Sequence, residues 1–226
     1  KCHKIIGPGN AYATAAKRVL SNYIDSGLPA GPSECIILAD ENADPEKVAL
    51  DWMIEAEHGP DSAALLVTNC EELVYKAAEI VERQLEKISD KRREFVTTNF
   101  NTYGGAIITE SLEESIDFVN DYAPEHMEVM TKEPFVVLPK IKNAGEILLG
   151  DYTPVTLCNF VLGPNAILPT GQFAKTYSSV SVMDFLKRSS VGYESRDGFE
   201  MVRDYAYKIA TVEGFDTHAL AVKERK

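Results

Sequence analysis

CIILADENADPEKVALDWMIEAEHGPDSAALLVT, residues 35–68, is the segment with the clearest fold signal in this chain. It begins and ends with short apolar runs, residues 35–39 and 63–68, of the length and composition of buried strands. Between them, Pro45 suits the first turn of a helix that we expect to reach about Glu57, where Gly59-Pro60 stops it. A strand, a helix and a second strand in this order predict a parallel sheet with a crossover helix.

The same alternation continues on both sides of this segment. Gly- and Pro-rich residues 150–180 are predicted to be a long functional loop, and a short tail is expected after residue 212. Ser111, with Glu114 three residues later, is the pattern of a helix cap. The pattern therefore predicts an α/β fold with a largely parallel sheet. The further predicted helices are residues 11–23, 71–93, one that begins after Ser111, and 195–212; the further predicted strands are residues 105–109, 127–130 and 147–149.

Composition excludes several classes of protein. The chain has 226 residues, of which 45% are hydrophobic, so it is long and apolar enough for a sizeable core. Its net charge of −12 argues against a general nucleic-acid surface, and no apolar run approaches the ~18 residues of a membrane span. No apolar segment follows the first residues, so we expect no signal peptide. The scattered cysteines, without a CxxC pair, predict reduced thiols in a cytoplasmic protein.

Two pairs of polar residues are candidates for chemistry. Glu55 and His58 lie three residues apart, so on a helix they share one face and could bind one metal ion. The alternative is a surface histidine at the negative end of the helix dipole, and for this motif alone that alternative is favoured. Glu125 and His126 stand at the entrance to a predicted strand and suit general acid–base work. On these residues alone, a merely structural role is as well supported.

Two further motifs carry weaker signals. Glu213 and His218 bracket the end of the last long helix, which alone favours a helix terminus followed by a flexible tail. The turn ending at Asn10 could hold a cofactor group near backbone N–H groups, but it is neither GxGxxG nor a phosphate-binding P-loop.

A series of motifs follows in one order along the chain. They are Gly7-Pro8-Gly9-Asn10, Ala16-Lys17-Arg18, Pro29-Ala30-Gly31-Pro32-Ser33-Glu34, Ala56-Glu57-His58-Gly59-Pro60, Tyr122-Ala123-Pro124-Glu125-His126, Asn143-Ala144-Gly145, Leu149-Gly150-Asp151-Tyr152-Thr153-Pro154, Leu168-Pro169-Thr170-Gly171 and Asp184-Phe185-Leu186-Lys187-Arg188. In this order they resemble the histidinol dehydrogenase family from Ile6 almost to the C-terminus. The resemblance implies a Rossmann-like α/β/α sandwich with a helical C-terminal segment.

The resemblance also implies an activity. Members of the family oxidise an amino alcohol to an amino acid in two NAD-dependent steps, with a bound zinc ion. Carried over, His126 is the base that takes the alcohol proton, and Glu125 activates the water that attacks the intermediate aldehyde. Zinc would act as a Lewis acid on the substrate oxygen.

The remaining site residues are implied by the same resemblance. Asn10 matches a cofactor-contacting residue, and Ser33 and Glu213 match substrate-contacting residues. In the family, the residues that match Glu213 and His218 come from the partner subunit, so a homodimer is implied. The matching metal set is Glu55, His58, Asn159 and His218, and these four, with His126, are also expected to contact substrate.

Three positions depart from the histidinol pattern. Glu55 stands where the family has a metal-binding Gln, and Asn159 where it has a metal-binding Asp, so the charge of the set is unchanged and we expect the metal to stay. Ala166 replaces a His without visible compensation, which suggests another primary alcohol as substrate, such as 2,3-dihydroxypropane-1-sulfonate, with L-histidinol still open. The candidate partners of a sulfonate, otherwise ordinary surface charges, are Lys17, Arg18, Lys175 and Arg188.

The resemblance also sets the expected domain organisation. Residues 1–30 are expected to end a cofactor-binding domain, residues 31–180 to form the main α/β catalytic domain, and residues 181–226 to form a helical segment that contributes to the dimer. The family has a substantial portion before the Gly-Pro-Gly-Asn motif, so this chain is expected to be the C-terminal part of a longer fold. The alternative function is a non-catalytic fragment that retains dimerisation or metal binding; the acidic charge disfavours a nucleic-acid-binding module.

Overall fold

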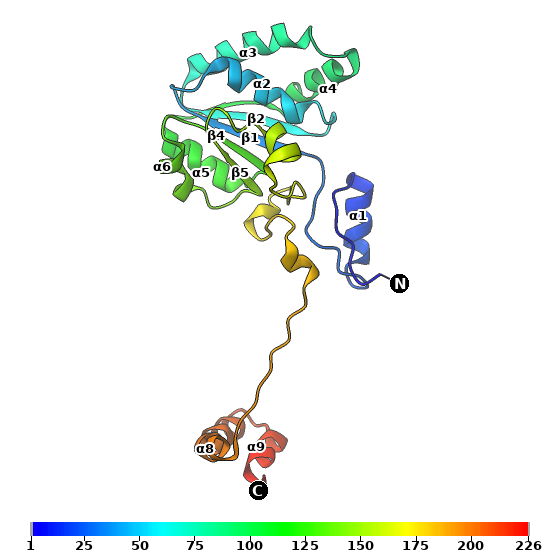
Figure 1. Cartoon of the computed structure of the whole chain (residues 1–226), viewed down its shortest axis with the longest axis vertical. Coiled ribbons are helices and arrows are strands. Elements are labelled where there is room, and N and C mark those ends of the chain that lie inside the picture. Colours follow the sequence, from blue (N-terminus) through cyan, green and yellow to red (C-terminus); the bar gives the residue numbers. More distant parts are fainter. Residues whose placement is uncertain (1, 226) are drawn as a thin grey trace. The chain divides into compact units, whose positions relative to one another are not determined.

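The structure, a computed structural model, describes residues 2–225 and divides into two compact units. The first ends at Phe185 and the second begins at Leu186 (Figure 1).

The first unit is built on a sheet of five strands in the order β3-β2-β1-β4-β5. All four strand pairs are parallel, which confirms the α/β prediction. The central strand is the CIILA run, whose side chains are buried on both faces, as a strand covered by helices on both sides requires. The strands are β1 (Glu34–Ala39), β2 (Ala63–Thr68), β3 (Gly105–Ile108), β4 (His126–Met130) and β5 (Glu146–Leu149).

Helices cover both faces of this sheet (Figure 1). On one face Ile37 packs with the residues of α2 and α3, and on the other Ile36 and Leu38 pack with α5. The alternation follows from the strand geometry, which points successive side chains to opposite faces. The first face carries α2 (Pro45–Ala56), α3 (Glu71–Leu85) and α4 (Asp90–Phe100); the second carries α5 (Leu112–Tyr122), α6 (Pro134–Val137) and the 3₁₀ turn η1 (Leu138–Lys140).

The single helix predicted over residues 71–93 is wrong, because the structure contains two helices there. α3 ends at Leu85, whose carbonyl accepts a hydrogen bond from the Arg93 side chain (2.9 Å), and Ser89 begins α4. The turn returns the chain to α2, where the Phe100 ring lies 4.9 Å from that of Trp52. The charged residues of this segment alone predict one continuous helix, but packing of α4 against α2 requires the chain to turn between α3 and α4.

Residues 150–180 form a long connection, as predicted, but short helical turns interrupt it. Gly171 N–H donates to Glu34 Oε1 (2.9 Å), and Thr170 N–H donates to the Pro29 carbonyl (3.1 Å). The second half of this connection is therefore hydrogen-bonded to the first residue of β1 and to the segment before it. The short helical elements of this connection and its continuation are α7 (Val155–Leu157), the π turn η2 (Cys158–Leu162), η3 (Phe173–Lys175) and η4 (Val182–Phe185).

The two ends of the chain are helical. α1 (Ala11–Leu20) stops three residues before the predicted end. In the second unit, Ser195 caps α8 (Arg196–Val212) as predicted. The tail expected after residue 212 instead contains α9 (Asp216–Lys223), which packs on α8 through a hydrogen bond from Arg203 to the Lys223 carbonyl (2.9 Å).

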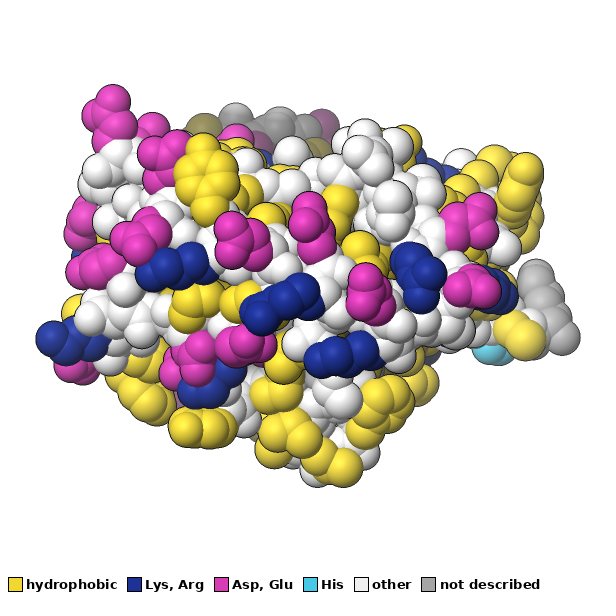
Figure 2. Space-filling model, turned by 90° about the horizontal axis from the view of Figure 1, so that it is seen from above, with side chains coloured by type: hydrophobic (Ala, Val, Ile, Leu, Met, Phe, Trp, Pro, Cys, Tyr) yellow, Lys and Arg dark blue, Asp and Glu magenta, His cyan; other side chains and the backbone are white. Residues whose placement is uncertain are grey.

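The surface and the thiols agree with the composition. Figure 2 shows a face on which acidic and basic side chains are interspersed. Ion pairs occur within α3, as between Lys76 and Glu72 (2.7 Å), and between α3 and α2, as between Arg83 and Glu46 (3.3 Å). Within residues 2–225, no helix is both long and apolar enough to cross a membrane. All four cysteines are free thiols.

Candidate active site

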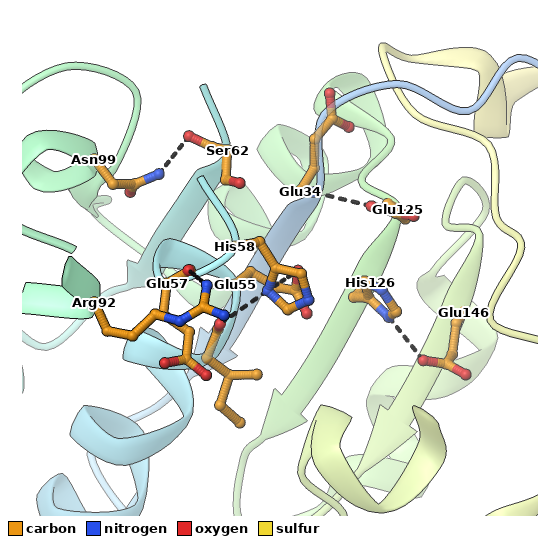
Figure 3. Close-up of polar contacts among 11 residues, drawn as sticks. Glu34, Glu55, Glu57, His58, Ser62, Arg92, Asn99, Glu125, His126 and Glu146 are labelled. Atoms are coloured by element: carbon orange, nitrogen blue, oxygen red, sulfur yellow. Dashed lines mark hydrogen bonds and ion pairs between the residues drawn. The ribbon is translucent and has the colours of Figure 1, made fainter. Parts of the chain in front are cut away.

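The candidate residues of the first unit gather at the amino-terminal edge of the parallel sheet. His126 is the first residue of β4, and it is paired with Cys35 on β1 and with Glu146 on β5. α2 runs back across the sheet after β1, so its last turn brings Glu55 and then His58 to the same edge (Figure 3). Residues far apart in sequence thus meet at one place.

His126 is a buried imidazole with one defined partner. Its Nδ1 lies 2.9 Å from Glu146 Oε2, and the side chains are only 5% and 6% exposed. Burial alone lowers the pKa of His126, but the bond to Glu146 and the nearby carboxylates of Glu125 and Glu55 outweigh it and raise that pKa. The sequence analysis did not identify Glu146. Like His126, it is the first residue of a strand, but only the pairing of β4 with β5 shows that the two side chains meet.

Glu125 lies immediately before β4 and is buried beside the start of β1. Its Oε2 accepts a hydrogen bond from the Glu34 N–H (3.0 Å) (Figure 3). Burial raises its pKa to about 8, against the lowering effects of His126 and the Glu34 N–H. A carboxyl with such a pKa changes protonation state near neutral pH, as a general base or acid requires.

Glu55 and His58 form the second pair, at the end of α2. Glu55 is 1% exposed, yet neither of its carboxylate oxygens has a hydrogen-bond partner among the described residues. His58 Nδ1 lies 3.3 Å from Glu55 Oε2, but its hydrogen bond goes to the Ile54 carbonyl (3.2 Å). A carbonyl only accepts, so this bond places the proton on Nδ1 and leaves the lone pair of Nε2 free for a ligand.

Asn159 supplies a further buried oxygen without a hydrogen-bond partner among the described residues. The residue lies on η2, and this oxygen is its Oδ1. Buried polar oxygens without partners are costly unless something pairs with them, and a cation is one such partner. Glu55, His58 and Asn159 are therefore a chemically suitable donor set for a divalent ion. Among residues 2–225, no group of three or more His, Cys, Asp and Glu side chains is gathered closely enough to hold a metal.

A second pair of buried carboxyls lies behind the site and was not predicted. Asp51 precedes Glu55 by one helical turn, and Glu128 follows His126 on the same face of β4. Burial raises the pKa of Asp51 to about 6 and that of Glu128 well above its ordinary value. Glu128 Oε1 accepts the Val155 N–H (2.9 Å), so it anchors the start of α7, the short helix that precedes Asn159.

Among the described residues, no hydrogen bond or ion pair joins the side chains of Asn10 and Ser33 to this cluster. Asn10 caps α1 by accepting the Ala13 N–H (3.0 Å), and Ser33 is half-buried directly before β1. Ala166 is exposed. Of the predicted sulfonate partners, Arg18 lies over the Phe173 ring at 5.6 Å, and Lys175 pairs with Asp121 (3.1 Å).

Glu213 and His218 belong to the second unit. They line one groove of about 450 Å³ between α8 and α9, where the His218 ring lies 5.1 Å from that of Phe215. Both side chains are exposed within this unit. The structure therefore gathers Glu55, His58, Glu125 and His126 in the first unit, and Glu213 and His218 in the second.

A comparison with known families decides the family of the chain. The family model described as histidinol dehydrogenase matches residues 1–226. The chain belongs to the histidinol dehydrogenase family. It is 52% identical over 226 residues to the histidinol dehydrogenase of Synechocystis sp., and 49% identical over 223 residues to a histidinol dehydrogenase homolog of Colwellia psychrerythraea.

A solved structure agrees with this family membership. The crystal structure of histidinol dehydrogenase from Elizabethkingia anophelis matches with a TM-score of 0.93 and 34% identity, covering 99% of this chain and 51% of that one. An acetylating aldehyde dehydrogenase from Geobacillus thermoglucosidasius, 14% identical with a TM-score of 0.53, shares the fold alone. The chain spans about half the length of its relatives, covering 52% of the Synechocystis protein and 50% of the Colwellia protein.

Proposed function

We propose that this histidinol dehydrogenase family chain carries the catalytic pair of a NAD- and zinc-dependent dehydrogenase, which oxidises a primary alcohol through an aldehyde to a carboxylate. The observation that carries the proposal is the buried Glu125-His126 pair beside Glu55 and His58 at one edge of the sheet. Family membership supports the same chemistry.

His126 takes the proton of the substrate hydroxyl in each oxidation. Its raised pKa makes it a stronger base than an ordinary histidine, and its burial keeps competing water away. Bound NAD would supply the hydride acceptor that both oxidations need. Asn10, in the turn before α1, is our candidate for contact with this cofactor.

Glu125 acts between the two oxidations. As a carboxylate it takes a proton from water, whose oxygen attacks the aldehyde carbon and becomes the second oxygen of the product. The proposal requires Glu125 to be ionised, which its pKa of about 8 allows for a growing fraction of molecules as the pH rises through that value.

Glu55, His58 and Asn159 would hold the zinc ion, together with the partner's His218. The unpartnered oxygens of Glu55 and Asn159 and the free Nε2 of His58 support this assignment. Bound zinc supplies Lewis acidity to the substrate oxygen. The set contains one carboxylate and one amide, so its charge depends on Glu55 alone.

The charge of the zinc set is tested by exchanging its two oxygen ligands. Glu55→Gln leaves two neutral amides, so we expect zinc affinity to fall by about 10–100-fold, as measured by competition with a chelator. The double variant Glu55→Gln with Asn159→Asp restores one carboxylate and is expected to bind zinc within about threefold of wild type. Equal affinity of Glu55→Gln and wild type would contradict the assignment of Glu55 as a ligand.

The substrate is proposed to be L-histidinol or a related alcohol such as 2,3-dihydroxypropane-1-sulfonate. Ala166 and the exchanged ligands at Glu55 and Asn159 support the second, whereas the histidinol dehydrogenases among its relatives support the first. NADH production by the zinc-loaded full-length protein, compared between the two alcohols, decides between them. His126→Ala is the control and is expected to lower kcat by about 10²–10⁴-fold. Absence of NADH with both alcohols would contradict the proposed substrates.

The assembly is proposed to be a homodimer in which Glu213 and His218 complete the partner's site. Their exposure on one groove of the second unit supports a role in contact with another surface. The free thiols fit a cytoplasmic location, where cysteines stay reduced.

A further inference from the structure

Glu146 is a buried carboxylate behind His126 that the proposed chemistry leaves without a role. The two residues are paired in register on neighbouring parallel strands, so their side chains leave the sheet on the same face. Glu146 Oε2 and His126 Nδ1 are 2.9 Å apart, the length of a charge-assisted hydrogen bond (Figure 3). The strand register therefore places the Glu146 carboxylate beside Nδ1 of the His126 imidazole.

The second oxygen of Glu146 is also held. Glu146 Oε1 accepts a hydrogen bond from the Cys158 thiol, on the π turn that carries Asn159. Burial raises the pKa of Glu146, but the bonds from His126 and Cys158 outweigh this and bring it below its ordinary value. Glu146 is thus an ionised carboxylate with both oxygens bound, which fixes its position against the ring.

An ionised carboxylate accepts hydrogen bonds and donates none. The nitrogen that it contacts must therefore carry the proton, so His126 has the N–H at Nδ1 and the lone pair at Nε2. A base needs that lone pair directed at the substrate, and the opposite tautomer would offer an N–H in its place.

We propose that Glu146 is a positioning residue that holds His126 in the Nδ1–H tautomer, so that Nε2 is the atom that takes the alcohol proton. This inference rests on the proposed function for the catalytic role of His126. Its structural part, the tautomer and orientation of the ring, stands on the His126–Glu146 contact alone.

The test compares Glu146→Gln with Asp40→Asn in the full-length protein. Both changes are isosteric and replace a buried carboxyl whose two oxygens accept hydrogen bonds, but Asp40 follows the last residue of β1, at the opposite edge of the sheet, where it accepts the Asn42 and Lys132 N–H groups. The side-chain amide that Glu146→Gln introduces could donate to Nδ1, which would allow the Nε2–H tautomer. We expect Glu146→Gln to lower kcat by about 10²–10³-fold with KM and zinc content within about threefold of wild type, and Asp40→Asn to keep kcat within about threefold.

Nitrogen NMR of protein labelled with ¹⁵N-histidine reads the tautomer independently of activity, with His126 assigned by comparison with His126→Ala. The proposal expects the proton on Nδ1 in the wild type and a populated Nε2–H form in Glu146→Gln. A wild-type proton on Nε2, or a Glu146→Gln protein with unchanged tautomer and kcat, would overturn it. If the wild type oxidises no alcohol, the proposed function fails while the NMR comparison still tests the role of Glu146.

Discussion

At the scale of single residues, the site depends on groups whose ordinary chemistry is shifted by burial. Glu125 is the strongest case, because desolvation raises its pKa to about 8 while the Glu34 N–H and His126 act in the opposite direction. The pKa of His126 is also raised, but for a different reason: desolvation acts to lower it, and the neighbouring carboxylates outweigh desolvation. The pair therefore consists of a carboxyl that is a weaker acid than an ordinary glutamic acid and an imidazole that is a stronger base than an ordinary histidine.

The shifted pKa of Glu125 predicts the pH dependence of the second oxidation. The base must be ionised, so with the aldehyde as substrate kcat is expected to rise about tenfold per pH unit at low pH and to level off above about pH 8. Glu125→Gln should remove this limb and lower kcat by about 10²-fold or more, whereas Glu113→Gln, on the exposed surface, should leave it intact. The measurement is NADH production from about pH 6 to about pH 9, and a flat wild-type profile would argue against Glu125 as the base.

At the scale of elements, the start of a helix depends on which side chains make capping hydrogen bonds, and a sequence pattern predicts these bonds only in part. Ser111 caps α5 by accepting the Glu114 N–H (3.2 Å), as predicted. The Glu114 carboxylate, however, accepts the Glu110 N–H (2.8 Å) and not that of Ser111. Ser89 also stands at a helix start, that of α4, but its side chain makes no capping bond.

These two serines form a matched pair for a stability test. Ser111→Ala removes a real cap and is expected to lower the free energy of unfolding by about 1 kcal/mol. Ser89→Ala removes no such bond, so we expect a change within about 0.5 kcal/mol. Urea denaturation of both variants measures the difference, and equal effects would mean that the Ser111 hydroxyl does not stabilise α5.

At the scale of the whole molecule, the candidate site residues are divided between two units. Glu125 and His126 lie in the first unit, and Glu213 and His218 lie in the second. The proposed homodimer joins the groups across subunits, so each site would use His126 of one chain and the partner's His218.

This arrangement predicts complementation between inactive variants. His126→Ala and His218→Ala proteins are each expected to be inactive, but subunits exchanged between them should form mixed dimers with one intact site. Random exchange would then restore up to about a quarter of wild-type activity. The assay is NADH production after joint unfolding and refolding, with each variant refolded alone as the control. No recovery, with mixed dimers demonstrated by mass spectrometry, would place both residues in one site of the same chain.

Local sequence patterns were sufficient to predict the α/β class and most of the strands. They also marked Glu125-His126 and Glu55/His58 as candidates, but only the family resemblance gave these pairs roles, which stay predictions. Apolar runs, turn residues and helical spacing act between neighbours in the chain, so a linear pattern displays them. Long-range packing instead sets the break between α3 and α4, the docking of α9, and the meeting of His126 with Glu146 across two strands. Contacts of that kind depend on strand register and on how helices pack over the sheet, and a linear pattern does not encode either one.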